Sequence, residues 1–319
     1  MEERTNYVCI GLDGGGTSTR LRTVDARGHR WTDENGASNP RIVGITRASK
    51  VISSLVGRAM HEYPDSKEFL VCAGIAGAAA ASMQRTLADS IKLDLRESAG
   101  VSIQITDDVT IAYEAAFAGD SGILLVVGTG SIVLVKTVAG MFIRSGGWGY
   151  LLGDEGSGYS IGRAGMRAVA ASIDSGETTP LTTQAAVGLE VLNREALIAK
   201  VYGSDYSPAA FARAVLEEAG RGDIQSLEII DRATRELVNR LFALIDLNDL
   251  DVTGAVKITG GLSRSRPYLL SLESVIRERF STLKIARSGR EPVEGALWMA
   301  NRMARRTTGR MADRVSHNG

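Results

Sequence analysis

Two stretches of the chain share one pattern: a β-favouring run, a glycine-rich turn and a second β-favouring run. The first is YVCIGLDGGGTSTRLRTVD, beginning at Tyr7, and the second is GILLVVGTGSIVLVK, beginning at Gly122. Apolar residues on both sides of each turn predict two β-hairpins. Because the copies occupy equivalent places in two α/β segments, they predict a chain built as two related halves.

The length of the chain agrees with two halves, because 319 residues are too many for one compact core and comfortable for two domains. We expect an α/β fold with its boundary near Gly119, giving one domain over residues 1–118 and another over 119–305. The tail, about residues 306–319, is not assigned to the second domain, because it could pack against the first domain. Helices are expected over residues 46–63, 80–93, 109–117, 158–174, 193–202, 208–219, 223–244, 268–280 and 291–305.

The first glycine turn differs from the phosphate loop of common NTPases, which needs a Lys-Ser/Thr pair and then a helix. The turn consists of Gly14, Gly15, Gly16, Thr17 and Ser18, and a strand follows it. Glycines let backbone N–H groups point at a phosphate, and the hydroxyls add donors. Asp13 would repel a phosphate, so we assign it to Mg²⁺ bound through water. The alternative is a plain hairpin turn in which Asp13 accepts a turn hydrogen bond.

Two further glycine turns shift that balance toward nucleotide binding. The second turn has no acidic residue, which suits direct contact with phosphate oxygens, and the third would let a base or ribose lie against the backbone. Each signal is weak by itself, but the three in this order are strong. The second turn is Gly128, Thr129, Gly130 and Ser131, and the third contains Gly260 and Gly261.

Two adjacent acids, Asp107 and Asp108, end the strand-like run VSIQIT just before a predicted helix. A carboxylate in this place can accept a proton from a substrate hydroxyl. Successive side chains of a strand point in opposite directions, so both acids cannot face one spot. We therefore expect one of them to act on substrate and the other to cap the helix, with capping as the alternative for either.

A loop rich in glycine, SGGWGYLLGDEGSGYSIGRAG, spans residues 145–165. Trp148 offers an apolar face for the C–H side of a sugar ring, and Asp154 can accept hydrogen bonds from its hydroxyls. The alternative is a long loop in which Trp148 belongs to the core and Asp154 and Glu155 are solvated or capping. The length and the glycine content of the loop favour a functional role.

Composition excludes several classes of partner. The 37 basic residues equal the 37 acidic residues, which gives no attraction to nucleic acid or to a membrane surface. Cys9 and Cys72 lie in apolar strand-like runs and are expected to be buried, reduced thiols. No signal-peptide pattern and no apolar run of membrane-spanning length is present, so we expect a cytoplasmic protein.

Taken together, these residues resemble the N-acetylglucosamine kinase and BadF/BadG-type ATPase family of the sugar kinase/actin superfamily. The matching motifs are GLDGGGTST, TDD followed by Ala112, GTGSI, GGWGYLLGDEGSG and ITGGLSRS, which cover most of the chain. The resemblance implies two domains of ribonuclease-H-like fold with Mg-ATP and substrate in the cleft between them. It also implies a homodimer.

The resemblance carries over residue by residue. It implies that Asp13 is the metal-associated acid, that Asp108 is the catalytic base, and that Asp107 lies with the substrate-binding residues. The first two glycine turns match the two phosphate loops, and Gly260 and Gly261 match the adenosine-side turn. The residues matched to sugar binding are Asn39 in GASNP, Gly147, Trp148 and Asp154, with Gly158 as a candidate for giving room beside the sugar.

The function expected from this resemblance is an ATP-dependent amino-sugar kinase that acts on the 6-hydroxyl of N-acetylglucosamine or glucosamine. One alternative is an activator ATPase of the same family, bridged by an iron–sulfur cluster, but both cysteines fall in predicted strands of the first half. Another is a sugar sensor or repressor, but no helix-turn-helix and no cysteine-rich zinc motif is present. A non-catalytic sensor is disfavoured because each catalytic position is filled.

Overall fold

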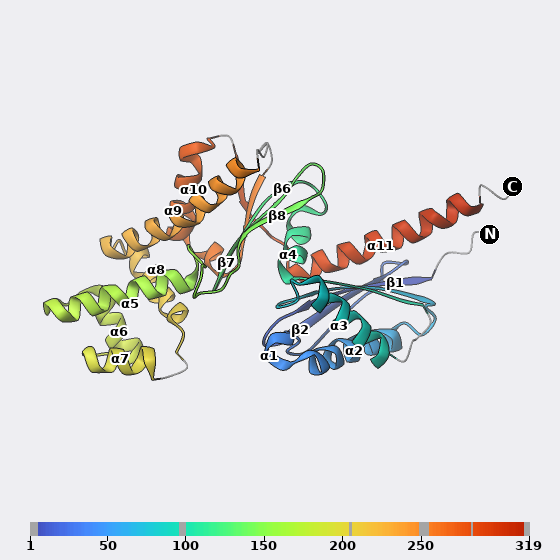
Figure 1. Ribbon diagram of the computed structural model, residues 1–319, viewed down its shortest axis with the longest axis horizontal. Helices are drawn as coiled ribbons and strands as arrows, with labels where there is room; N and C mark the ends of the chain where they lie inside the picture. The colour runs from blue at the N-terminus through green and yellow to red at the C-terminus, as the bar shows by residue number, and fades with distance from the viewer. Residues whose placement is uncertain (1–5, 96–99, 204–205, 249–254, 282, 316–319) are drawn as a thin grey trace. The chain divides into compact units, whose positions relative to one another are not determined.

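The computed structural model describes residues 6–95, 100–203, 206–248, 255–281 and 283–315, with side chains up to residue 306. The chain divides into two compact units, which are described separately. Unit 1 comprises Met1–Gly119 and Ser288–Gly319, and unit 2 comprises Asp120–Arg287. Figure 1 shows the elements of each unit.

Unit 1 contains a five-stranded mixed sheet with the order β3-β2-β1-β4-β5. Strands β1, β2 and β3 are antiparallel neighbours, whereas β4 and β5 run parallel to β1. The carboxyl ends of β1, β4 and β5 therefore meet at one edge of the sheet. The elements are β1 (Tyr7–Gly14), β2 (Ser18–Asp25), β3 (Arg30–Gly36), α1 (Pro40–Val43), α2 (Ile45–Glu62), β4 (Glu68–Ile75), α3 (Ala81–Asp94), β5 (Val101–Thr106), α4 (Asp108–Phe117) and α11 (Pro292–Val315).

Strand β1 is buried on both faces, because helices cover both sides of the sheet. Its alternate residues Val8, Ile10 and Leu12 belong to the core that includes α2 and α3, whereas Cys9 packs with Leu297 and its neighbours on α11. This division follows from the two-residue repeat of a strand, whose successive side chains point to opposite faces. A continuous apolar run is what such a strand requires.

Helix α11 belongs to unit 1, which corrects the expected boundary at residue 305. Close packing explains the difference, because α11 lies against β1 and α4 at two glycines. A Cβ on Gly11 would lie 2.4 Å from the backbone nitrogen of Leu297, and one on Gly295 would lie 1.9 Å from the carbonyl oxygen of Ile111. The whole helix, and not only the tail after residue 305, therefore returns to the first unit.

Unit 2 repeats the same sheet, with the order β10-β9-β6-β7-β8. Strands β6, β7 and β8 form the antiparallel part, and β9 and β10 run parallel to β6, so β6 corresponds to β1. The elements are β6 (Gly122–Val127), β7 (Ser131–Lys136), β8 (Phe142–Gly146), α5 (Gly158–Ser175), α6 (Pro180–Leu189), α7 (Arg194–Tyr202), η1 (Pro208–Phe211), α8 (Ala212–Gly220), α9 (Ile224–Leu247), β9 (Ala255–Thr259), η2 (Gly261–Arg264), α10 (Arg266–Arg279) and β10 (Lys284–Arg287).

Among the elements of unit 2, β8, β10 and α6 were not expected from the sequence. The two strands are short, and each of their residues is either exposed or only partly buried, so no strong apolar pattern marks them. Helix α6 begins with a capping box between Thr179 and Thr182 and has a proline in its first turn. Within the described ranges, no helix is both long and apolar enough to cross a membrane.

Candidate active site

The first glycine turn closes the hairpin between β1 and β2 and is held by backbone hydrogen bonds. Gly15 N donates to Ser18 O at 2.9 Å, and the amides of Ser38 and Asn39 both donate to Gly15 O, at 3.0 and 3.1 Å. A Cβ on Gly14 would lie 2.1 Å from the hydroxyl oxygen of the fully buried Ser38. The turn is thus held in one conformation while Gly16 and Thr17 stay exposed.

Asp13 and Asp108 lie close enough for their charges to interact. Burial and the neighbouring Asp108 carboxylate, opposed by Arg20, raise the pKa of Asp13 from 3.8 to about 6, and Glu291 adds to the rise. Arg20 stands opposite Asp13 in the hairpin register and is bound by Glu291 at 3.4 Å. The carboxyl ends of β1 and β5 therefore bring together the acid assigned to metal and the acid assigned to catalysis.

The two adjacent acids take different places at helix α4. Asp107 is the N-cap, and its Oδ1 accepts from the amide of Thr110 at 2.8 Å. Asp108 is the first helical residue and is half-buried. The capping role falls on Asp107, which leaves Asp108 as the acid that does not form this cap.

Asn39 also lies beside the first turn, at the N-cap of the short helix α1. Its Oδ1 accepts from the amide of Arg41 at 3.0 Å, and Arg41 Nε in turn donates to Gly77 O at 3.2 Å. A Cβ on Gly77 would lie 2.4 Å from Asn39 Oδ1, so the glycine gives room to this amide. Asn39, Asp13 and Asp108 thus belong to one edge of the unit 1 sheet.

The second glycine turn closes the hairpin between β6 and β7. Gly128 N donates to Gly130 O at 2.9 Å, and the first amides of α5, from Gly158 and Tyr159, donate to Gly128 O and Thr129 O at 2.8 and 3.1 Å. Helix α5 therefore begins directly on this turn. Gly158 gives room to the turn, since a Cβ there would lie 3.1 Å from Gly128 O.

Asp154 is buried beneath the second turn. Its side chain accepts from the amide of Ser131 at 3.1 Å, and the residue is 7 % exposed in the left-handed region, with φ of 66°. Nearby, Arg240 forms an ion pair with Glu155 and also interacts electrostatically with the carboxylate of Asp154. Burial lowers the pKa of Arg240, an effect that Asp154 opposes. Asp154, the residue expected to bind the sugar, therefore also stabilises the second glycine turn through its hydrogen bond with Ser131 N.

Trp148 is 73 % exposed, so it does not belong to the core. Gly147, its neighbour, adopts a φ of 72° and packs on Ile132, which sets the start of this loop. The turn at Gly260 and Gly261 follows β9 and lies next to the end of β6, because a Cβ on Gly260 would be 2.4 Å from Val127 O. Gly261 is exposed, with open space around the position of a Cβ.

Sequence reasoning missed several supporting residues. Arg20 carried a usable signal, since a hairpin that turns at residues 15–18 must place residues 13 and 20 opposite each other. Ser38 precedes Asn39 in the same motif, but nothing in the sequence around it indicated that it would support the first glycine turn. The pair of Arg240 and Glu155 joins α9 to a loop and leaves no local pattern.

The side chains near the first glycine turn could hold Mg²⁺ together with a nucleotide. Across the ranges that the structure describes, no cluster of three or more His, Cys, Asp or Glu side chains could hold a metal by itself. Mg²⁺ usually binds one or two carboxylates, water and substrate phosphates, so Asp13 beside the glycine turn is sufficient. A half-buried carboxylate next to a second acid would also gain from a cation. The residues of unit 1 fit this ion.

Comparisons with known proteins identify relatives of this chain. The chain is 31% identical over 271 residues to the N-acetylmuramic acid/N-acetylglucosamine kinase of Clostridium acetobutylicum, which covers 82% of this chain and 87% of the relative. It is 29% identical over 316 residues to the N-acetyl-D-glucosamine kinase of Dictyostelium discoideum, covering 92% and 97%. Both relatives are thus named as amino-sugar kinases.

Solved structures show the same fold. A Chromobacterium violaceum protein described as a candidate N-acetylglucosamine kinase superposes with a TM-score of 0.67 at 24% identity, covering 92% of this chain and 98% of that one. The expected α/β fold with two ribonuclease-H-like, actin-like units is confirmed by this likeness and by the two sheets. The model of the BadF/BadG/BcrA/BcrD ATPase family matches residues 10–300. The chain belongs to the BadF/BadG/BcrA/BcrD ATPase family.

Proposed function

We propose that the protein is an ATP-dependent amino-sugar kinase that phosphorylates the 6-hydroxyl of N-acetylglucosamine or glucosamine. One observation carries the proposal: Asp108, which leaves the helix cap to Asp107, lies beside Asp13 at the end of the strand that forms the first glycine turn. Membership of an ATPase family and the names of the two curated relatives support it. One relative's name adds N-acetylmuramic acid to the acceptors that should be tested.

In this mechanism the chain positions the reactants and handles one proton. The sugar oxygen attacks the γ-phosphorus, Asp108 takes the proton of that hydroxyl, and the bond to ADP breaks as ADP leaves with the electron pair. Amides of the glycine turns at residues 14–18 and 128–131 bind phosphate oxygens, apart from those of Gly15, Gly128 and Ser131, which donate within the protein. Gly260 and Gly261 receive the adenosine. Such transfer depends mostly on positioning and on charge stabilisation. Mg²⁺ held at Asp13 would supply further positive charge to the phosphates.

Sugar recognition is proposed for Asn39, Asp107, Gly147, Trp148 and Asp154. Trp148 is 73 % exposed, so its indole ring is accessible and can stack on a sugar ring. Asn39 and Asp107 each engage one side-chain oxygen in a helix cap, at Arg41 and Thr110. Their remaining polar atoms are the groups proposed to face the sugar.

A sugar kinase is preferred over an iron–sulfur activator because of the cysteines. Cys9 and Cys72 are fully buried in β1 and β4 and are not joined in a disulfide. Burial raises the pKa of both thiols to about 12, which opposes the thiolate that a cluster needs. The cytoplasmic location and the homodimer stay predictions, and the second is tested by gel filtration.

The deciding experiment is a coupled ADP-release assay with a panel of hexoses and hexosamines. We expect saturable, magnesium-dependent release with N-acetylglucosamine or glucosamine and none with the matching 6-deoxy sugar. Loss of a general base costs about 10²–10⁴-fold in rate, so Asp108→Asn should lower kcat by that factor and retain most of the ATP affinity. Asp89→Asn, an exposed change on α3, is the matched control. Full turnover by Asp108→Asn, or turnover of the 6-deoxy sugar, would contradict the proposal.

A further inference from the structure

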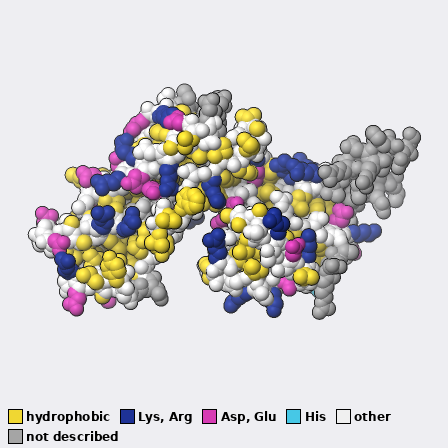
Figure 2. Space-filling view, viewed as in Figure 1, with side chains coloured by type: hydrophobic (Ala, Val, Ile, Leu, Met, Phe, Trp, Pro, Cys, Tyr) yellow, Lys and Arg dark blue, Asp and Glu magenta, His cyan; other side chains and the backbone are white. Residues whose placement is uncertain are grey.

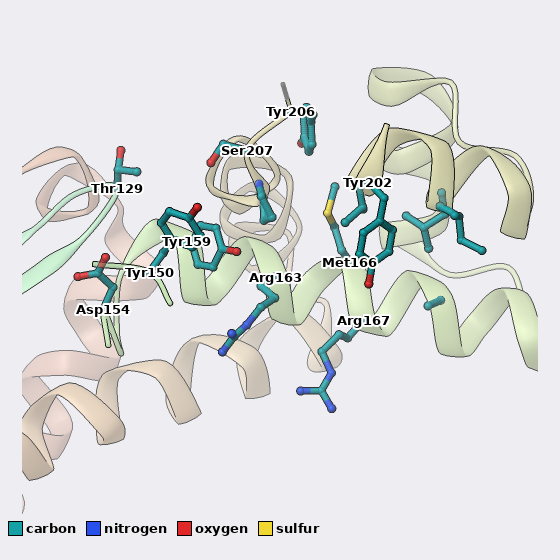
Figure 3. Close-up of a pocket in the computed structure, with 15 residues that line it drawn as sticks. Thr129, Tyr150, Asp154, Tyr159, Arg163, Met166, Arg167, Tyr202, Tyr206 and Ser207 are labelled. Carbon is teal, nitrogen blue, oxygen red and sulfur yellow. The ribbon is translucent and has the colours of Figure 1, made fainter. Parts of the chain in front are cut away.

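The loop between β8 and α5, residues 147–157, is bonded at both of its ends to Ser131 of the second glycine turn. At its start, Gly147 N donates to Ser131 O at 3.1 Å. Near its end, Asp154 Oδ1 accepts from the amide of Ser131 at 3.1 Å, and Glu155 O accepts from the Ser131 hydroxyl at 2.6 Å. In Figure 3, Asp154 lies at the end of a pocket along α5 that the same turn also lines. The loop and the turn therefore hold each other in place.

Arg240, on α9, contacts the same two ends of the loop. Its Nη2 pairs with Glu155, and a Cβ on Gly153 would lie 3.2 Å from that nitrogen. At the other end, a Cβ on Gly146 would lie 2.7 Å from Nη1. Gly146 is the last residue of β8 and has a φ of 88°, so a side chain there would be strained and would also displace the guanidinium. One planar, two-ended group thus joins the start of the loop to its end.

Arg240 differs from Arg235, an ion-paired arginine of the same helix. The side chain of Arg235 is 47 % exposed and pairs with Asp231 and Glu278 at 2.9 and 3.0 Å. Figure 2 shows basic and acidic side chains interspersed over the surface of α9 and α10. Arg240 is 20 % exposed, and its Nη1 is buried without a hydrogen-bond partner among the residues that the structure describes. Surface pairs contribute little, whereas a buried donor gains from each oxygen brought to it, so Arg240 responds to the position of the loop.

We propose that Arg240 is a positioning residue that couples sugar binding at the loop of residues 147–157 to nucleotide binding at the second glycine turn. This inference rests on the proposed function, which assigns Trp148 to the sugar and residues 128–131 to phosphate. A sugar that stacks on Trp148 orders the loop, and the ordered loop fixes its two ends around the guanidinium. The same ends hold Ser131, so the turn is ordered in the same step. Whichever ligand binds second then meets a site that the first has already ordered.

The test measures the Kd of the better proposed acceptor, N-acetylglucosamine or glucosamine, by calorimetry, with and without a saturating non-hydrolysable ATP analogue and Mg²⁺. We expect the analogue to lower the Kd of the sugar about fivefold, and the sugar to lower the Kd of the analogue by the same coupling factor. Arg240→Gln should reduce the factor to less than about twofold, because the two ends of the loop are then no longer joined. Arg240→Lys should do the same, since one ammonium can pair with Glu155 but cannot also reach the start of the loop. Arg235→Gln, which removes an ion-paired arginine from the exposed part of α9, is the matched control and should keep the factor.

Glu155→Gln tests the same contact from the loop. It should lower the coupling factor as Arg240→Gln does. The double variant should lose no more of the factor than either single variant, because the second change removes an interaction that is already lost. If Arg240→Gln fails to fold, Arg240→Lys and Glu155→Gln still decide the question.

The other outcomes separate this inference from the proposed function. If the Arg240 variants bind both ligands more weakly but keep the native coupling factor, the arginine only supports the fold, and the inference is overturned. A native factor near one, with good turnover of an amino sugar, would also overturn the inference and leave the kinase standing. A loss of coupling in Arg235→Gln as well would overturn the specific role of Arg240. Absence of both binding and turnover with every hexosamine would instead overturn the kinase proposal itself.

Discussion

Replacing Asp13 by asparagine should make the unliganded protein more stable at neutral pH. Burial and the Asp108 charge raise the pKa of Asp13 from 3.8 to about 6. Between about pH 4 and about pH 6 the folded protein keeps a proton that the unfolded chain has lost, so stability falls as the pH rises through this window. Above pH 6 the whole penalty is present, and an asparagine, which stays neutral, avoids it.

The size of the effect follows from the two pKa values. The difference between 3.8 and about 6, at 1.36 kcal/mol per pH unit, gives roughly 3 kcal/mol in the free energy of unfolding. For a domain of about 150–250 residues, each kcal/mol corresponds to roughly 2–4 °C in Tm. Asp13→Asn should therefore raise the Tm by roughly 6–12 °C at pH 7.5 and leave it almost unchanged near pH 4.

Thermal unfolding in EDTA without nucleotide, at pH 7.5 and pH 4, measures this difference. Asp89→Asn on the exposed face of α3 serves as the control and should change the free energy of unfolding by less than about 0.5 kcal/mol at both pH values. Added Mg-ATP should stabilise the native protein more than the variant, because only the native protein holds the metal-associated acid. A variant that is less stable at pH 7.5, or whose advantage persists at pH 4, would refute the reasoning.

Three further predictions test other parts of the structure. Asp154→Ala removes the acceptor of the buried Ser131 amide and should cost about 1–3 kcal/mol of stability, measured by urea unfolding, together with a higher KM for ATP; an unchanged KM would separate Asp154 from the second glycine turn. Gly295→Ala places a Cβ 1.9 Å from a backbone oxygen of α4 and should destabilise unit 1 by more than about 2 kcal/mol, and equal Tm values would contradict the close packing of α11. Cys9 and Cys72 are fully buried, so a thiol reagent should modify neither until the protein is unfolded in urea, and rapid modification of the folded protein would contradict their burial.

Local pattern was sufficient for much of the fold. The two hairpins were recognised because apolar alternation and glycine turns are properties of neighbouring residues. Helix α11 shows what local pattern omits: its periodicity predicts a helix, but its place on unit 1 depends on contacts of Gly11 and Gly295 with distant backbone. Strand β10 is four residues long, which is too short for any periodicity to be evident.

The candidate site divides in the same way. Asp13 and Asp108 could be proposed because each lies at the end of a predicted strand, where parallel strands deliver side chains to one edge. The sequence left open which of the two adjacent acids caps the helix, and only the bond from Thr110 N to Asp107 distinguishes them. Asp154 lies in a loop and also accepts a hydrogen bond from the amide of Ser131. This contact depends on the fold of the whole loop, so the spacing of residues in the sequence could not predict it.

The two halves each bring one carboxylate to a glycine turn, but they do so by different means and with different consequences. Asp13 is part of β1 itself, and burial with Asp108 opposes its ionisation, so a cation near it would relieve a real cost. Asp154 comes from a separate loop, and its charge is met by the amide of Ser131 and by the field of Arg240. A carboxylate that is already satisfied gains little from a metal, whereas a carboxylate held beside another acid gains much. The duplicated fold thus places in unit 1 an acid that would gain from a metal, and in unit 2 an acid that already accepts from a backbone amide. This difference supports the proposal of Mg²⁺ at the first turn and of direct phosphate contact at the second.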